Sequence, residues 1–254
     1  MNKLIHIGIY GLGNVGQHLL ERLLELNQFK LTVCTRTYKN ITVKANVELT
    51  TEIANLQGCD LIICAVTDQW MLPKIEELAT IAPTVSTSGT VNLSSLNTPF
   101  QVGTFYPLQS FVASQPVNWK GLPILVHAAN KKLENTLLEL GNLLSEFCFV
   151  LNPEERKKLH LAAVFANNFT THLFDIAAHY CTENNLQFDW LKPLIFQSIS
   201  KLKDVEPHAI QTGPAKRNDQ TTIQEHLAML EGTNKELYKL LTQSIQNHFN
   251  HDKL

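Results

Sequence analysis

Three glycines near the start of the chain have the spacing of a turn that binds dinucleotides. Gly11, Gly13 and Gly16 form the pattern G-x-G-x-x-G within "IHIGIYGLGNVGQHLLERL", residues 5–23. The pattern follows an apolar run typical of a strand and opens a helical run, which is the context that this turn needs. Gly11 can make the tight turn, Gly13 can let a pyrophosphate approach the backbone, and Gly16 can let helix and strand pack closely. The N–H groups at the helix N-terminus would bind the phosphates. We predict a dinucleotide site; the alternative is a tight turn that binds nothing.

The residue about 20 positions further along indicates which dinucleotide is bound. An acidic side chain at that offset would accept a hydrogen bond from an unmodified ribose, but this sequence has Arg36, within "CTRTYKN". A cation between Thr35 and Thr37 suits a 2′-phosphate, so the sequence favours NADP(H) over NAD(H). The alternative is an arginine that is merely solvated.

A long helical run over residues 157–180 carries an unusual polar face. At about 100° per residue, one sector gathers His160, Asn167, Asn168, Thr171, His172, Asp175 and His179. Lysine and glutamate, which dominate an ordinary solvated face, are almost missing from it, so we predict a cleft or an interface. His160, Asn167 and Thr171 share a line along the helix, and His160 is the natural proton carrier near neutral pH. The alternative is a helix that lines a subunit interface through hydrogen bonds.

The opposite sector of the same run is apolar and is predicted to belong to the core. Its members are Ala162, Phe165, Ala166, Phe169, Leu173, Ile176, Ala177 and Tyr180. On the polar side, His172, Asp175 and His179 have a spacing that can reach one metal ion. No fourth ligand or H-E-x-x-H pattern accompanies them, so we predict no metal site.

A second polar segment, "AIQTGPAKRNDQTT" at 209–222, is predicted to be a loop between helices. Arg217 can bind a carboxylate through two parallel hydrogen bonds, and Gln211 and Thr212 are further donors. The alternative is a helix connection that carries a surface cation.

The elements that must position these residues follow from hydrophobic periodicity. Apolar runs alternate with helical patterns through the first half of the chain, as in "LIHIGIY" followed by "NVGQHLLERLLEL", then "LTVCT", "DLIICAV" followed by "QWMLPKIEELA", and "PTVSTSG". This alternation predicts a parallel sheet. Further strand-like runs at 102–106, 122–128 and 147–151 predict a sheet larger than a minimal nucleotide fold.

The character of the chain changes at residue 152. Asn152 can cap a helix, Pro153 suits its first position, and Glu155 completes a capping box. A long helix is predicted from there to about Tyr180, and only helical patterns follow, at about 189–204, 220–231 and 233–249. We predict an α/β Rossmann-like domain with extra strands at 1–151 and an all-helical C-terminal domain at 152–254.

Composition excludes several classes of protein. The 254 residues are 44% hydrophobic, and 21 Lys and Arg against 23 Asp and Glu leave a net charge of −2, which does not favour nucleic acid or an anionic membrane. The five cysteines show no metal-type spacing, so we interpret them as reduced. With no apolar leader or long apolar span, a cytoplasmic protein is expected.

Several segments resemble a known bacterial family, namely "GLGNVGQHL", "AVTDQWM", "TSGTV", "GTFYPLQSF", "HLAAVFANNFTTHLF", "LKPLI" and "QTGPAKRND". In that family a Rossmann-like domain precedes a C-terminal domain of unknown function, and members are named as NADP oxidoreductases. More distantly, the layout is similar to pyrroline-5-carboxylate reductase, deazaflavin-dependent NADP reductase, prephenate dehydrogenase and the 6-phosphogluconate dehydrogenase superfamily. The resemblance implies a helical domain that completes the active site and forms a homodimer.

The resemblance also implies roles for individual residues. The pyrophosphate would lie on Gly11, Leu12, Gly13, Asn14, Val15 and Gly16, and the ribose phosphate on Thr35, Arg36 and Thr37. Ala65, Val66 and Thr67 would pass under the cofactor, and Ser88 and Gly89 would approach the nicotinamide. Tyr106, within "FYPLQ", would stand in a substrate-side loop where prephenate dehydrogenases have a histidine. The long helix lacks the Lys and Asn pattern of the hydroxyacid dehydrogenases and offers His160, Asn167 and Asn168 instead.

We therefore predict an NADP(H)-dependent oxidoreductase that moves a hydride to or from a small polar, anionic oxo, imino or hydroxy compound. His160 would be the acid/base group, and Asn167 and Asn168 would position the substrate. Further substrate contacts would come from Tyr106, Thr171, Gln211, Thr212 and Arg217. The alternatives are a nucleotide-binding sensor or assembly module without turnover, and a deazaflavin reductase.

Overall fold

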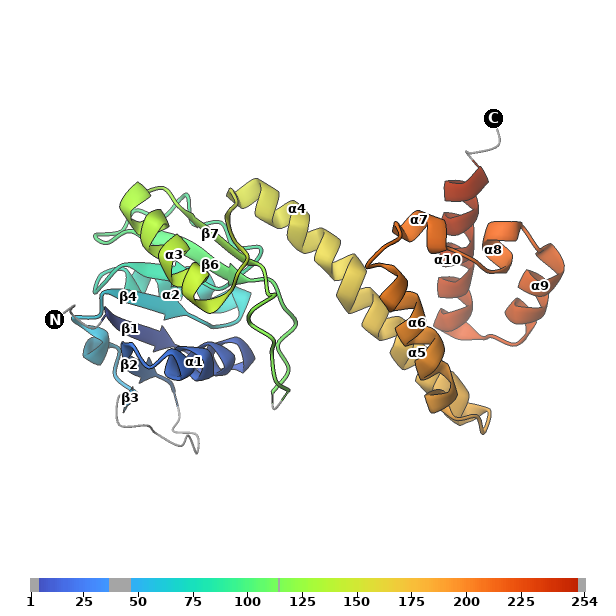
Figure 1. Cartoon of the computed structure of the whole chain (residues 1–254), viewed down its shortest axis with the longest axis horizontal. Coiled ribbons are helices and arrows are strands. Elements are labelled where there is room, and N and C mark those ends of the chain that lie inside the picture. Colours follow the sequence, from blue (N-terminus) through green and yellow to red (C-terminus); the bar gives the residue numbers. More distant parts are fainter. Residues whose placement is uncertain (1–4, 37–46, 114, 251–254) are drawn as a thin grey trace. The chain divides into compact units, whose positions relative to one another are not determined.

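The computed structural model describes residues 5–36, 47–113 and 115–250 (Figure 1). The chain forms two compact units, Met1–Asn167 and Asn168–Leu254. The helix that begins at Pro153 starts within the first unit. The predicted domain boundary at residue 152 stays a prediction.

The first unit is built on one sheet of eight strands. The strands are β1 Ile5–Tyr10, β2 Phe29–Cys34, β3 Val47–Thr50, β4 Leu61–Cys64, β5 Thr84–Ser86, β6 Val102–Pro107, β7 Ile124–Ala128 and β8 Cys148–Val150. Their order is β3-β2-β1-β4-β5-β6-β7-β8, and every neighbouring pair is parallel except β6 and β7. The predicted Rossmann-like sheet with extra strands is confirmed, with β3 as an addition that we did not predict.

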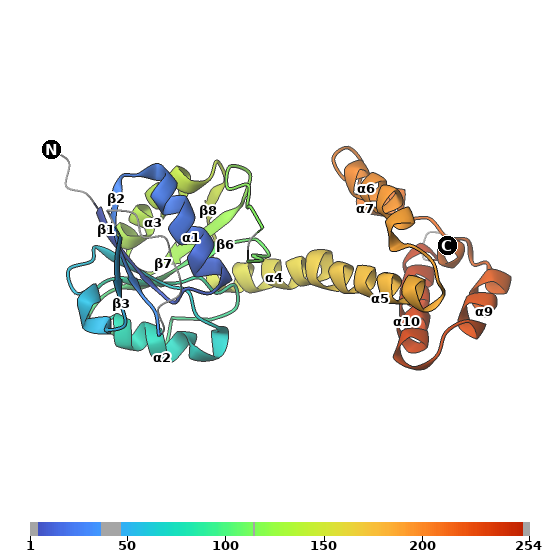
Figure 2. The ribbon, with the colours of Figure 1, turned by 90° about the horizontal axis from the view of Figure 1, so that it is seen from below.

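Two hydrophobic cores flank this sheet. Helices α1 Asn14–Leu26 and α3 Lys131–Leu144 place leucines in one core, and α2 Asp68–Leu78 places Met71, Ile75 and Leu78 in the other. Figure 2 shows α1 and α2 on opposite sides of the strands. Because the sheet is covered on both faces, the central strand β4, with the sequence "LIIC", is a continuous apolar run. The chain leaves β1 for β2 on one side and later pairs β4 on the other, which makes the carboxyl ends of β1 and β4 the switch point of the sheet.

The long helical run begins at the predicted capping box. The Asn152 side chain accepts from the backbone N–H groups of Glu154 and Glu155, and the Glu155 carboxylate accepts from the Asn152 N–H at 3.2 Å. The run consists of α4 Pro153–Ala163, the π-helical stretch η2 Val164–Phe169 and α5 Thr170–Glu183.

The apolar sector of this run is not core in the single chain, so that prediction was wrong. Phe165 is 63% exposed and Phe169 is 51% exposed, and Ala162, Ala166 and Leu173 are exposed as well. Ile176, Ala177 and Tyr180 are half-buried. A helical wheel at 100° per residue assumes an uninterrupted α-helix, whereas a π-helical stretch has a different hydrogen-bond register. The sector therefore does not continue as one straight stripe through 164–169.

The second unit is helical, as predicted. Its further elements are η3 Phe188–Leu191, α6 Lys192–Lys201, α7 Pro207–Ile210, α8 Pro214–Arg217, α9 Gln220–Ala228 and α10 Gly232–Asn250. The short α8 lies inside the segment that we predicted to be a loop. Among the residues that the structure describes, no helix has the length and apolar character needed to cross a membrane.

Candidate functional site

The glycine turn has three glycines with three different surroundings. Gly11 has a φ of +94°, and a Cβ there would lie 2.6 Å from the carbonyl oxygen of Ala65. A Cβ at Gly16 would collide with the carbonyl oxygen of Gly11. At Gly13, by contrast, a Cβ would have no described atom within 4 Å. Gly11 and Gly16 are therefore required by backbone conformation and packing, whereas Gly13 faces open space.

That open space lies at the beginning of α1. Gly13 occupies the N-cap position, and no side chain of the described residues caps this helix end. The first turn of α1 thus presents backbone donors and the positive end of the helix dipole, which suit an anionic group. The absence of a side chain at Gly13 lets such a group approach the backbone.

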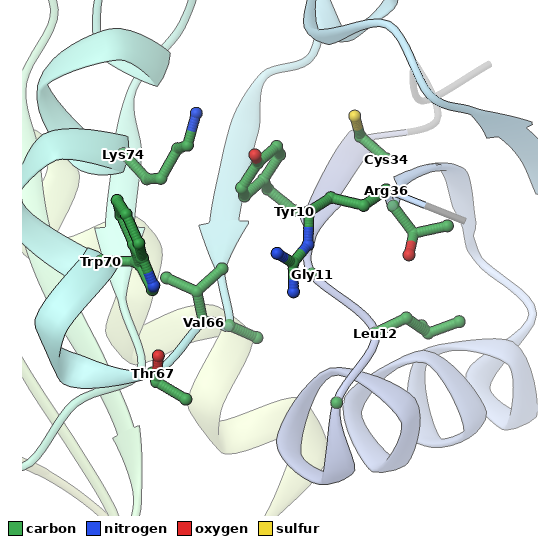
Figure 3. Close-up of a pocket in the computed structure, with 12 residues that line it drawn as sticks. Tyr10, Gly11, Leu12, Cys34, Arg36, Val66, Thr67, Trp70 and Lys74 are labelled. Atoms are coloured by element: carbon green, nitrogen blue, oxygen red, sulfur yellow. The ribbon is translucent and has the colours of Figure 1, made fainter. Parts of the chain in front are cut away.

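A pocket of about 400 Å³ opens beside the turn (Figure 3). Eight of the residues predicted to bind the cofactor line it: Gly11, Leu12, Gly13, Thr35, Arg36, Ala65, Val66 and Thr67. Four further lining residues were not predicted: Tyr10, Cys34, Trp70 and Lys74. Residues from the ends of β1, β2 and β4 thus meet at the switch point of the sheet.

The pocket carries two cationic side chains on different walls. Figure 3 shows Arg36 reaching toward the middle of the pocket, with Trp70 and Lys74 on the far side. The Lys74 ammonium lies 2.6 Å from a Glu77 oxygen and 5.6 Å from the centre of the Tyr10 ring. The hydrogen bond to Glu77 raises the pKa of Lys74, so the side chain stays charged near neutral pH. Trp70 and Lys74 come from the first two turns of α2. The sequence feature that could have indicated them is that this helix follows the buried strand β4.

Other predicted cofactor residues lie outside the lining of this pocket. The Asn14 amide donates to the carbonyl oxygen of Phe111 at 3.0 Å, and the His18 ring contacts the carbonyl oxygen of Val112 at 3.1 Å. Asn14 therefore holds the connection between β6 and β7 rather than lining the pocket. Val15, Gly16, Ser88 and Gly89 are also outside the lining, and Thr37 lies outside the described residues.

A second group of predicted residues meets within the first unit. The Tyr106 hydroxyl and His160 Nδ1 are 3.0 Å apart and share a hydrogen bond, although 54 residues separate them in the sequence. Gly89 lies against both side chains, because a Cβ at Gly89 would lie 2.6 Å from His160 Nδ1 and 2.8 Å from Tyr106 Cζ. Tyr106 and His160 are half-buried, and burial is the main reason why the pKa of Tyr106 is raised, with Asp68 adding to the rise. Three residues from β6, α4 and the loop after β5 thus form one cluster.

The loop that carries Gly89 is fixed from several sides. Ser88 Oγ accepts from the N–H groups of Thr90 and Val91, and the Thr90 hydroxyl donates to Asp68 at 2.5 Å. Arg156, which we did not predict, is only 1% exposed and donates to the carbonyl oxygens of Gly89 at 3.2 Å and Val91 at 2.5 Å. Nothing in the sequence indicated that Arg156 is buried, because a charged residue in the first turns of a helix normally faces water.

The remaining predicted residues lie at the end of the first unit or in the second unit. Asn167 is exposed at the end of the first unit, and the second unit holds Asn168, Thr171, Gln211, Thr212 and Arg217. The Arg217 side chain is 64% exposed and lies 4.0 Å from an Asp219 oxygen. His179 Nδ1 lies 3.5 Å from an Asp175 carboxylate oxygen, and the described residues contain no group of three or more side chains suited to a metal ion. The roles predicted for these residues stay predictions.

Comparison with known proteins identifies a matching domain family and a similar solved structure. Residues 122–245 match the family model of a domain of unknown function, DUF2520. The structure of a protein from Bacteroides fragilis, described as a "putative NADP oxidoreductase", is 31% identical, with 96% of this chain and 98% of that chain covered and a TM-score of 0.86. No curated protein matches.

Two more distant structures share the fold. Protein TM1727 from Thermotoga maritima is 18% identical, with 98% of this chain and 100% of that chain covered and a TM-score of 0.71. Pyrroline carboxylate reductase from Plasmodium falciparum, solved with NADP bound, is 13% identical, with 96% and 98% covered and a TM-score of 0.60. At these identities the likeness shows the fold alone.

Proposed function

The chain belongs to the family in which a Rossmann-like domain is followed by DUF2520, and from this premise we propose that it is an NADP(H)-dependent oxidoreductase. Its substrate would be a small polar, anionic oxo, imino or hydroxy compound. The observation that carries the proposal is the pocket beside the glycine turn, with Arg36 on one wall and open space over Gly13.

The pocket residues fit a dinucleotide that bears a 2′-phosphate. Open space over Gly13 leaves room for a pyrophosphate at the helix N-terminus. None of the described residues that line the pocket is acidic, whereas Arg36 and Lys74 are cationic. A carboxylate would favour an unmodified ribose and repel a 2′-phosphate, and a guanidinium binds a phosphate through paired donors. This charge balance supports NADP(H) over NAD(H).

The Tyr106 and His160 pair supports an acid/base role for His160. When bound, a reduced nicotinamide supplies a hydride, and the protein must supply or remove a proton. His160 is half-buried, shares its Nδ1 with Tyr106 and is held beside Gly89. A proton-transfer group needs a fixed position of this kind.

Titration with NADPH and NADH in parallel, at matched salt, tests the proposed cofactor. We expect NADPH to bind more tightly, and Arg36→Met to weaken NADPH by about 10- to 100-fold while NADH changes little, because a hydrogen bond to a charged group contributes about 1.5–3 kcal/mol. Lys30→Met is the matched control, since Lys30 is an exposed cation of β2, the strand that precedes Arg36, but does not line the pocket. Equal or absent binding of both dinucleotides would refute the proposal.

Turnover separates an oxidoreductase from a dinucleotide-binding sensor. Once a screen of oxo and imino acids finds a substrate, His160→Gln should leave NADPH affinity unchanged and lower kcat by about 10²- to 10⁴-fold. Tight NADPH binding without oxidation by any compound of the screen would instead favour the sensor.

We also propose a homodimer that forms through the helical unit. Large apolar side chains of η3 and α6 are exposed in the single chain: Trp190, Leu194, Phe196 and Ile199. Exposed apolar groups of this size mark contact surfaces, and a specific dimer buries about 1,200–2,000 Å² in total. Light scattering should give twice the chain mass, and Leu194→Glu should shift it toward the monomer. A monomeric wild-type protein at micromolar concentration would contradict the proposal.

A further inference from the structure

Arg156 is a buried cation whose partners are backbone carbonyl groups. The side chain is 1% exposed, its Nε and Nη2 donate to Gly89 and Val91, and its Nη1 has no hydrogen-bond partner among the described residues. Burying a charge without full compensation costs stability, and guanidinium keeps its charge at any ordinary pH. A costly cation in this position is best explained by what it does to its surroundings.

Those surroundings are the loop that supports the Tyr106 and His160 pair. Arg156 binds the loop at Gly89 and Val91, on either side of Thr90, whose hydroxyl donates to Asp68. Gly89 in turn lies so close to His160 Nδ1 and Tyr106 Cζ that a single methyl group there would displace them. The position of this loop therefore limits the space that both side chains can occupy.

Arg156 and His160 also lie on the same helix, one turn apart, in α4. Side chains at i and i+4 lie on one face of a helix. Anchoring Arg156 therefore fixes the rotation of α4 about its axis, and with it the direction from which His160 reaches Tyr106. The same residue thus holds both sides of the hydrogen bond: the loop against which the pair packs and the helix that carries the histidine.

We propose that Tyr106 and His160 act as one proton-transfer unit and that Arg156 is its positioning residue. The inference rests on the proposed function, since it assigns the acid/base step of that oxidoreductase. Tyr106 becomes the group that exchanges a proton with the substrate. His160 then returns a proton to the Tyr106 oxygen through their shared hydrogen bond.

The step balances in the reducing direction with a reduced nicotinamide dinucleotide as the hydride donor. The substrate carbon gains the hydride, and its oxygen or nitrogen takes the Tyr106 hydroxyl proton as that atom gains the electron pair. His160 passes its Nδ1 proton to the phenolate oxygen and takes up a proton from water at Nε2. One hydride and one solvent proton are consumed and Tyr106 is restored. The imidazole returns to its Nδ1–H tautomer by proton exchange with solvent before the next turnover.

Electrostatics favour the same arrangement. Three charged or titratable groups act on the Tyr106 phenol: Asp68 from α2, and Arg156 and His160 from α4. Burial and Asp68 raise the pKa of Tyr106, and Arg156 is the cation that lowers it. A fixed positive charge beside the phenol stabilises the transient phenolate.

The test needs no substrate, because it follows the phenol itself. Placing 3,5-difluorotyrosine at position 106 of the full-length protein lowers the phenol pKa into a pH range that the fold tolerates, so that its ionisation can be followed by absorbance. Removal of a nearby cation should raise this pKa. We expect that rise in Arg156→Met and a value close to wild type in Arg156→Lys, which keeps the charge.

Lys157→Met is the matched control, because it removes the next cation of α4, which is more exposed and pairs with Glu154 at 3.4 Å. It should leave the phenol pKa unchanged. An unchanged pKa in a folded Arg156→Met protein would overturn the inference. If Arg156→Met does not fold, Arg156→Lys decides through the ¹⁵N resonance of His160 Nδ1, since one ammonium cannot span both carbonyl groups as the guanidinium does. A wild-type resonance of His160 Nδ1 in Arg156→Lys would also overturn it.

The outcome is separable from that of the proposed function. NADPH affinity should be the same in all these variants, because Arg156 does not line the dinucleotide pocket. Failure to bind NADPH in the wild-type protein would refute the proposed function while leaving the phenol titration interpretable. Normal binding with an unresponsive phenol would refute only the role of Arg156.

Discussion

Gly13→Ala separates a glycine needed for binding from glycines needed for folding. The backbone at Gly13 has φ −75° and ψ −168°, a conformation that alanine adopts without strain, and the new methyl group would have no described atom within 4 Å. Gly11 and Gly16 offer no such test, because a Cβ at either would run into backbone atoms.

The expected effect on stability is close to zero. Alanine is a poorer N-cap than glycine by about 0.5–1 kcal/mol, and it stabilises by about 0.4–1 kcal/mol through the lost entropy of the unfolded chain. These two terms nearly cancel. Because about 1 kcal/mol corresponds to roughly 2–4 °C for a chain of this size, Tm should move by no more than a few degrees.

The expected effect on dinucleotide binding is large. An added methyl group needs a separation of roughly 3.5 Å from a phosphate oxygen, so where it projects toward the phosphate it displaces that oxygen from the ~2.9 Å position of a hydrogen bond to a backbone N–H. Loss of one such charge-assisted bond costs about 1.5–3 kcal/mol, which is about 10- to 100-fold in Kd. Fluorescence titration with NADPH measures this directly.

Gly121→Ala is the control for this experiment. Gly121 also has no described atom within 4 Å of an added Cβ, but it lies in the connection before β7 and not in the glycine turn. Both variants should fold like the wild type, and only Gly13→Ala should lose affinity. Wild-type NADPH affinity in a folded Gly13→Ala protein would refute the reasoning that a phosphate approaches the backbone at this point.

Three further perturbations have defined outcomes. Gly89→Ala should lower stability by about 1–3 kcal/mol through overpacking, measured by urea denaturation, and combining it with His160→Ala should recover part of that loss; simple additivity would show that the two sites do not touch. Asn152→Ala removes the capping box of α4 and should cost about 1 kcal/mol in the same assay, with no change expected if the cap is irrelevant. Burial raises the pKa of Cys34 to about 11, so at pH 8 only about one thiol in a thousand is ionised and a disulfide reagent should label Cys34 far more slowly in the folded protein than in urea; equal rates would contradict its burial.

Periodicity and motif context predicted most of the first unit, because parallel strands buried on both faces leave apolar runs that cannot be mistaken for surface. The strand β3 was not predicted because "VELT" is short and alternates polar and apolar residues, so only its pairing with β2 defines it. The apolar face of the long helix was misjudged for a different reason: a wheel cannot anticipate the π-helical stretch at Val164–Phe169 or the exposure of Phe165.

The candidate sites show the same division between local and distant information. The place of Arg36 beside the glycine turn could be predicted because it stands at a fixed offset from the glycines, and the structure has it in the lining of the pocket. Trp70 and Lys74 could not be assigned from their own spacing, since their role follows from which strand end lies beside which. Arg156 was missed because an arginine in the first turns of a helix normally faces water, and only the carbonyl groups of a loop more than 60 residues away explain its burial.

Asn14 has a consequence for attempts to transplant this coenzyme turn. Its amide donates to Phe111, so the turn is tied to the connection that follows β6, the strand that carries Tyr106. A graft of the G-x-G-x-x-G cassette from another protein would keep the glycines and discard this tether. The cassette is therefore not modular. A chimera that preserves the glycines but not Asn14 would loosen the connection after β6. Any loss of activity in it would then be wrongly explained by weaker binding of the coenzyme.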